Sequence, residues 1–82
     1  MKNIAEQVQS RHPATGQVAR WFTWDHLRPG LAQDVSKMSG LFAEEILDAI
    51  EDDSPELTAG LRKLLEAKDC FVRAALPPVA AP

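Results

Sequence analysis

The hydrophobic positions along the chain fall into helical patterns, and the clearest pattern lies between residues 54 and 76. Its seam has a four-three spacing and carries one lysine: Leu57, Leu61, Leu64, Lys68, Phe71 and Ala75. Ser54 fits an N-cap, Pro55 fits the first helical position, and Pro77 cannot continue a helix. We therefore predict one helix from Ser54 to Leu76, whose seam faces another helix.

A second long helix is predicted from Leu31 to about Glu51, after Pro29-Gly30. It carries two apolar stripes, one of them with small residues at its start: Leu31, Val35, Met38, Phe42, Ile46 and Ala49; and Ser36, Gly40, Ala43, Leu47 and Ile50. Two stripes predict burial on two sides, by a first helix and by other subunits. The short turn over residues 51–55 predicts that the two long helices are antiparallel neighbours.

A shorter helix is expected from His12-Pro13 to Thr23, with Trp21 and Phe22 on the apolar face that packs into the core. The predicted fold class is all-α, a short N-terminal helix followed by a long antiparallel helical hairpin. Residues 12–76 form this hairpin domain. Residues 1–11 and 77–82 are expected to be a flexible N-terminus and a flexible C-terminal tail.

The 82 residues allow one domain, with 12 acidic and 9 basic residues and a formal charge of -3. This balance disfavours DNA binding, which needs a basic face. A single cysteine excludes an internal disulfide and fits a reducing compartment. The sequence shows neither a membrane-spanning apolar run nor a signal peptide, so we expect a cytoplasmic protein without a membrane partner.

Charge is distributed unevenly along the two long helices. Between Met38 and Leu61 the chain has seven acids and no base, whereas four of its bases follow: Arg62, Lys63, Lys68 and Arg73. In an antiparallel pair of helices, Arg28 and Lys37 lie near the basic end, next to Trp24. One end of the molecule is therefore expected to be basic and the other acidic.

Several residues near the basic end could bind a ligand. Trp24 lies off the apolar face, so core packing and stacking on a nucleobase both stay open for it. Lys68 either extends its amine to water or binds a ligand. Arg73 could hold a phosphate. The sequence has no metal-ligand spacing, nucleophile motif or glycine-rich phosphate loop, so we expect a binding protein without enzymatic activity, metal or cofactor.

Two blocks of the sequence, RWFTWDHLRPGLAQDVSK and PELTAGLRKLLEAKDCFVRAAL, resemble the short phage proteins that carry the anti-CBASS and anti-Thoeris hairpin domain. The resemblance covers about residues 12–78. It implies a homo-oligomer, expected as a homohexamer. It also implies binding of cyclic di- or trinucleotides, or cyclic ADP-ribose isomers, in pockets between protomers. Such a protein sequesters these messengers uncleaved in the host cytoplasm, and so evades host immunity.

The resemblance also implies site residues. Trp24 with Leu27 matches an aromatic-x-x-Leu segment whose aromatic residue stacks on a base. In the family a polar or basic residue early in the long helix contacts a phosphate. Ser39 stands at this position, where a lysine is expected, and Lys37 is nearby, so the dinucleotide pocket would lack that lysine. Arg73, followed by small residues, matches an arginine of an axial pocket for larger cyclic nucleotides. Adding neighbours chosen by position and charge, we expect the ligand-binding residues to be Trp24, His26, Arg28, Lys37, Ser39, Lys68, Asp69 and Arg73.

The alternative prediction is a small acidic helical module that inhibits a host protein. The acidic stretch from Glu44 to Glu56 would then dock on a basic partner.

Overall fold

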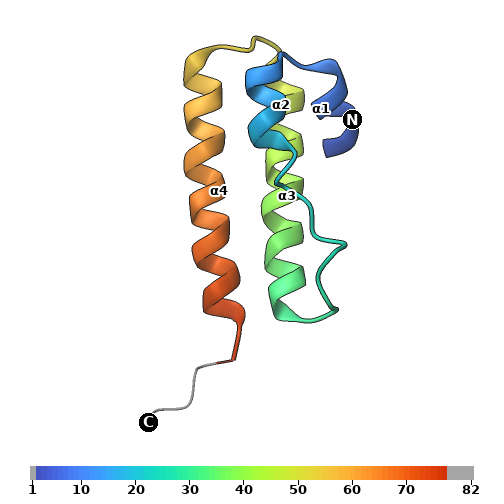
Figure 1. Ribbon diagram of the computed structural model, residues 1–82, viewed down its shortest axis with the longest axis vertical. Coiled ribbons are helices and arrows are strands. Elements are labelled where there is room, and N and C mark those ends of the chain that lie inside the picture. Colours follow the sequence, from blue (N-terminus) through green and yellow to red (C-terminus); the bar gives the residue numbers. More distant parts are fainter. Residues whose placement is uncertain (1, 78–82) are drawn as a thin grey trace.

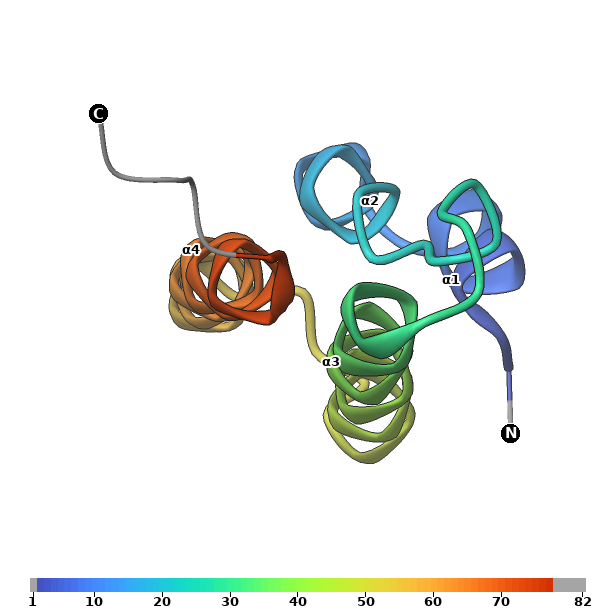
Figure 2. The same ribbon diagram turned by 90° about the horizontal axis from the view of Figure 1, so that it is seen from below.

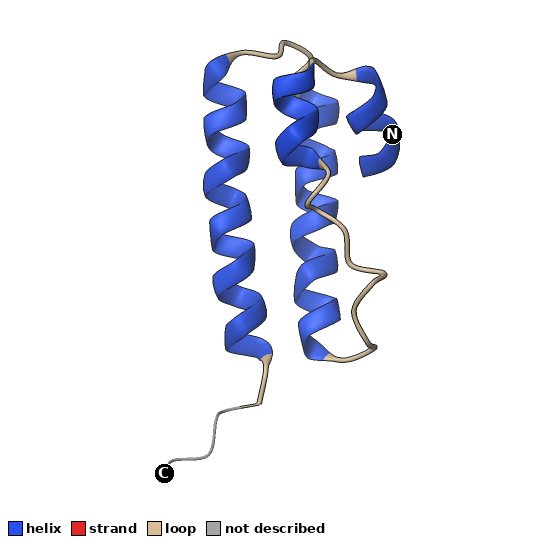
Figure 3. Cartoon of the chain, in the orientation of Figure 1, coloured by secondary structure: helices blue, strands red, loops and turns tan. Residues whose placement is uncertain are grey.

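Four helices make up the fold: α1 (Ile4–Ser10), α2 (Pro13–Ala19), α3 (Leu31–Ala49) and α4 (Pro55–Ala75) (Figure 1). The computed structural model describes residues 2–77, and within this range it contains no strand (Figure 3). The all-α prediction is therefore confirmed. The long helices α3 and α4 lie side by side and run in opposite directions, while α1 and α2 cover one side of the pair (Figure 2).

Local sequence signals set both ends of α4 and the start of α2 at His12-Pro13, but not the end of α2. Ser54 caps α4, because its Oγ accepts a hydrogen bond from the backbone N–H of Leu57 at 3.2 Å. Helix α2 ends at Ala19, four residues before the predicted end. The next two amides bond three residues back, Trp21 to Val18 and Phe22 to Ala19, which tightens the backbone.

This early end separates two neighbouring aromatic residues that were expected to share the core. Phe22 is fully buried, whereas Trp21 is 56% exposed. The prediction for Trp21 was therefore wrong, because the helical spacing on which it rested stops at Ala19.

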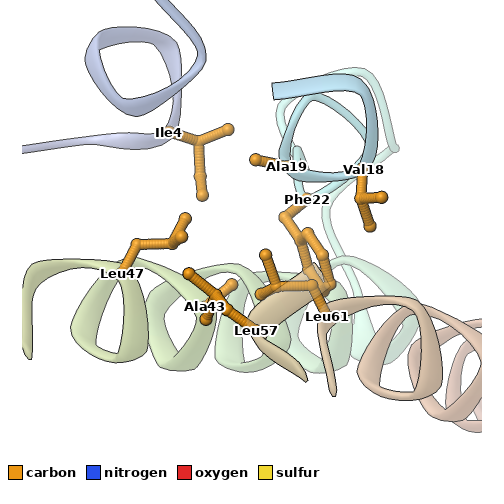
Figure 4. Packing of buried hydrophobic residues seen from close by; sticks show 8 residues of the cluster. All are labelled: Ile4, Val18, Ala19, Phe22, Ala43, Leu47, Leu57 and Leu61. Atoms are coloured by element: carbon orange, nitrogen blue, oxygen red, sulfur yellow. The ribbon is translucent and has the colours of Figure 1, made fainter. Parts of the chain in front are cut away.

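The core lies where α2 meets the two long helices. Its buried apolar residues come from all four helices and from the segment after α2: Ile4, Val18, Ala19, Phe22, Ala43, Leu47, Leu57 and Leu61 (Figure 4). On α3 the core uses the stripe that begins with small residues, since Ser36, Gly40, Ala43 and Leu47 are all buried. The other stripe of α3 stays largely open.

The N-terminal segment is a packed helix rather than the flexible end expected for residues 1–11. Ile4 and Gln7 of α1 are buried, and α1 contacts α2 and α3. The buried carboxylate of Glu44 accepts a hydrogen bond from the backbone N–H of Ile4 at 3.2 Å. A seven-residue helix is unstable alone, so these tertiary contacts hold it. Of the tail expected over residues 77–82, residues 78–82 lie outside the described part of the chain.

An arginine between α1 and α2 binds the far end of α3. The guanidinium of Arg11 donates to Asp53 Oδ1 at 2.8 Å, and to the carbonyls of Leu47 and Ile50 at 2.7 Å each. Leu47 lies in the last turn of α3 and Ile50 is its C-cap, where backbone acceptors lack helical partners. Arg11 therefore caps α3 and ties the N-terminal helices to the turn before α4.

The carboxylate of Asp53 joins the same network. It accepts hydrogen bonds from the backbone N–H of His12 at 3.1 Å and from the hydroxyl of Thr15 at 2.8 Å. The hydrogen bond from Arg11, with help from these two donors, lowers the pKa of Asp53 below its usual value, although partial burial acts in the opposite direction.

Replacing Asp53 by Asn should lower the free energy of unfolding by about 1–3 kcal/mol at neutral pH, since bonds to a charged acceptor are lost. Because the pKa of Asp53 is lowered on folding, its contribution is present above the ordinary value of 3.8 and disappears as pH falls through the folded-state pKa. Urea unfolding between neutral and strongly acidic pH tests this. The control is Asp52→Asn, an exposed neighbour, which should change little. Equal losses in both variants would contradict the assignment.

Within residues 2–77, none of the helices combines the length and the apolar character that crossing a membrane requires.

Candidate functional site

The connector between α2 and α3, residues 20–30, is held in place by side chains that bind its carbonyls. Gln33 Nε2 of α3 donates to the carbonyl of Leu27 at 2.9 Å. Ser36 Oγ of α3 donates to the carbonyl of Thr23 at 3.1 Å. An irregular segment needs such partners for its backbone, so the sequence of α3 fixes the path of the connector.

From the other side, Lys68 of α4 binds the connector. Its Nζ donates to the carbonyls of Trp21 at 2.6 Å and Thr23 at 3.2 Å, and the side chain is buried. The groups that meet this seam lysine are therefore backbone oxygens. Burial lowers the pKa of Lys68, and the nearby Asp69 carboxylate opposes that effect. An ammonium has three donors, so one remains beyond the two carbonyls.

Trp24 packs against α3 at Gly40, because glycine has no side chain and leaves room for the indole. A Cβ at Gly40 would lie 2.5 Å from Trp24 Cζ3 and 2.9 Å from the carbonyl oxygen of Phe22. The half-buried indole thus serves packing. The pocket of about 300 Å³ beside it contains the carboxylates of Asp25 and Glu44, and no basic residue among the described residues that line it.

A larger pocket lies between the end of α2, the connector and α4. We call it the Trp21 pocket; it has a volume of about 570 Å³ and is lined by Arg20, Trp21, Thr23, Asp25, His26, Leu65, Lys68 and Asp69. This volume falls within the usual range for small-molecule sites. The pocket thus combines an exposed indole, two basic side chains, two carboxylates and an imidazole.

Next to it, a pocket of about 220 Å³, the Arg73 pocket, extends toward the C-terminal end of α4. His26, Lys68 and Asp69 line both pockets, and Arg73 lines only the second. The Arg73 guanidinium donates to Cys70 Sγ at 3.3 Å and is exposed. Four of the predicted ligand-binding residues are therefore brought together.

The other predicted residues lie elsewhere. Arg28 and Lys37 are exposed, and neither lines the Trp21 or the Arg73 pocket. Ser39 Oγ donates to the carbonyl of Val35 one turn earlier, and Ser39 lies in an apolar groove. Trp24 is held against Gly40, as described above.

Sequence reasoning did not select Arg20, Trp21 and Asp25 as site residues. Helical spacing assigned Trp21 to the core, and that spacing ends before it. The available signal was the adjacent Arg20-Trp21 pair: the guanidinium lies 4.8 Å from the centre of the Trp21 ring, a cation–π contact that needs only neighbouring residues.

The apolar groove forms a separate surface, which we call the open face. It has a volume of about 540 Å³ between α3 and α4, and its large apolar residues are Leu31, Val35, Met38, Phe42, Leu64 and Phe71. Met38 is 65% exposed and Phe71 is 58% exposed. A second apolar pocket, of about 320 Å³, continues it toward Ile50 and Leu57. An apolar surface of this extent is typical of an interface.

Comparisons with protein-family models, curated proteins and solved structures found no match to this chain.

Replacing Lys68 by Met should remove both hydrogen bonds to the connector while keeping the packed stem. The Trp21 carbonyl then loses its side-chain donor, whereas the Thr23 carbonyl keeps the hydrogen bond from Ser36, so we expect a decrease of about 1–3 kcal/mol in the free energy of unfolding. Amide hydrogen exchange should also become faster in the connector. The matched control is Lys63→Met, an exposed lysine of the same helix. If the two variants unfold alike, Lys68 does not hold the connector.

Proposed function

We propose that this protein binds and sequesters cyclic oligonucleotide messengers without cleaving them, and thereby counteracts host anti-phage signalling. The observation that carries the proposal is the convergence of His26, Lys68, Asp69 and Arg73 in adjoining pockets beside an exposed indole. The resemblance of the two sequence blocks to the phage hairpin-domain family gives the ligand class.

The chemistry of these pockets fits such a ligand. A cyclic dinucleotide presents flat bases and two phosphate groups. Arg73 provides a planar set of donors for a phosphate, and Lys68 has one donor beyond its two carbonyl bonds. His26 of the connector lines the same pocket and can donate to the same anion.

The acidic total charge does not prevent anion binding at this place. The basic residues of the site come from the second half of α4 and the end of α2. Asp25 and Asp69 also line the site, but seven of the 12 acidic residues lie between Glu44 and Glu56, around the turn between α3 and α4. The two ends of the long helices are far apart (Figure 1), and exposed charges beyond ~10 Å are strongly screened.

The protein would act as a homo-oligomer, expected as a hexamer, with a second copy covering the open face. Its apolar residues come from α3 and α4, whereas α1 contacts α2 and α3. An antiparallel second copy would place the basic end, with Arg28, Lys37 and Arg73, against the acidic end, with Asp48 and Glu51. Such complementarity fixes the direction of pairing.

Isothermal titration against cyclic di-AMP, cyclic di-GMP, cyclic GMP–AMP, cyclic tri-AMP and a cyclic ADP-ribose isomer should show binding of at least one of them. Mass spectrometry after denaturation should recover that ligand uncleaved. Arg73→Ala should weaken binding by about 10- to 150-fold, the effect of losing a charged hydrogen bond. Arg62→Ala, an exposed arginine of the same helix that lines neither pocket, is the control. Absence of binding by the unmodified protein would refute the proposed function.

Sedimentation velocity should show the unmodified protein as an oligomer. Met38→Glu places a charge on the open face and should shift the protein toward a monomer, because burying an unpaired carboxylate is costly. Gln9→Glu adds the same group at an exposed position of α1 and should leave the oligomer intact. A monomeric unmodified protein, or equal behaviour of the two variants, would contradict the interface.

A further inference from the structure

The chain has five aromatic residues, three Phe and two Trp, and their surroundings differ sharply. Phe22 is in the core, while Phe42 and Phe71 belong to the apolar open face. Trp24 and Trp21 remain as candidates for stacking on a base. A nucleotide site needs an aromatic surface next to cations, since the base and the phosphate belong to one ligand.

The two tryptophans differ in the charges around them. The described residues lining the pocket beside Trp24 include the carboxylates of Asp25 and Glu44 and no base, so a phosphate there would be repelled. The Trp21 pocket contains Arg20 and Lys68, whose charges balance the carboxylates of Asp25 and Asp69. Its indole is more than half exposed, whereas Trp24 lies against Gly40.

Arg20 prepares the indole of Trp21 for stacking. Its guanidinium lies over the ring, 4.8 Å from the ring centre. This contact orients a side chain that is 56% exposed. The backbone of Trp21 is also fixed, because its carbonyl accepts the 2.6 Å hydrogen bond from Lys68. Less ordering is then required on binding.

Two carboxylates in the same pocket restrict the kind of base. Asp25 and Asp69 line the Trp21 pocket and accept hydrogen bonds but donate none when ionised. Amino groups on adenine, guanine and cytosine can donate to them. A base whose edge presents a carbonyl oxygen in that position, such as hypoxanthine in place of adenine, meets a carboxylate with another acceptor. A site whose acceptors are carboxylates therefore binds more weakly a base that lacks the exocyclic amino group.

We infer that Trp21, held by Arg20, is the base-stacking surface of this protein, and that Asp25 and Asp69 select a base with an exocyclic amino group. This inference rests on the proposed function, since it identifies the base class that the same site takes. Trp24 has a different part: it packs the connector onto α3 at Gly40 and thereby positions the residues of the pocket.

The two tryptophans allow a direct test by fluorescence. Trp24→Phe leaves Trp21 as the only tryptophan, and its emission should change when cyclic di-AMP or cyclic tri-AMP binds. Trp21→Phe leaves only Trp24, whose emission should stay nearly constant. If ligand binding alters Trp24 and leaves Trp21 unchanged, the assignment of the stacking surface is overturned.

Affinity measurements complete the test. Trp21→Leu should weaken binding by about 5- to 150-fold, the range expected for losing one stacked base, without loss of helical structure. For the unmodified protein, the analogues in which inosine replaces adenosine should bind at least about 10-fold more weakly. Asp25→Asn and Asp69→Asn should reduce this preference, because an amide can also donate.

The failures of the two proposals are distinguishable. If the unmodified protein binds no cyclic nucleotide, the proposed function fails, and this inference fails with it. If it binds and Trp21→Leu retains full affinity, only the stacking surface is overturned. Equal binding of the adenosine and inosine ligands would overturn the role of the carboxylates.

Discussion

The buried ammonium of Lys68 is the interaction on which the site depends. Taking a charged amine out of water is costly, and here two backbone carbonyls of the connector compensate. The connector in turn obtains partners for carbonyls that belong to no helix. One hydrogen-bonded group therefore joins α4 to the segment after α2, and it determines where Trp21, Asp25 and His26 stand relative to α4.

A second buried cation acts at the opposite end of the long helices. Arg11 satisfies carbonyls of the last turn of α3 and pairs with Asp53 in the turn before α4. Both cations thus bind carbonyl oxygens at places where the helical hydrogen-bond pattern stops. With its two ends fixed in this way, a small core of eight buried apolar residues suffices to position all four helices.

The apolar open face and the polar pockets lie on different surfaces of the molecule. The apolar stripe of α3 that begins at Leu31 is only partly covered within residues 2–77, since Val35 and Ile46 are half-buried and Leu31, Met38 and Phe42 are exposed. Burial of this stripe by other subunits stays a prediction. The polar pockets lie between α4, the connector and the end of α2. The proposed assembly through the open face would therefore use a different surface from the Trp21 pocket.

Local signals in the sequence determined the all-α class, the start of α4 at Ser54-Pro55 and the start of α3 at Leu31, because capping and periodicity act between near neighbours. They also indicated that Lys68 needed partners. Only the tertiary structure decided which partners these are and that α1 is a packed helix. It also decided that Trp21, rather than Trp24, lies beside the basic residues Arg20 and Lys68. Each of these depends on atoms far apart in the chain, such as Lys68 and the Trp21 carbonyl, and no local pattern encodes such contacts.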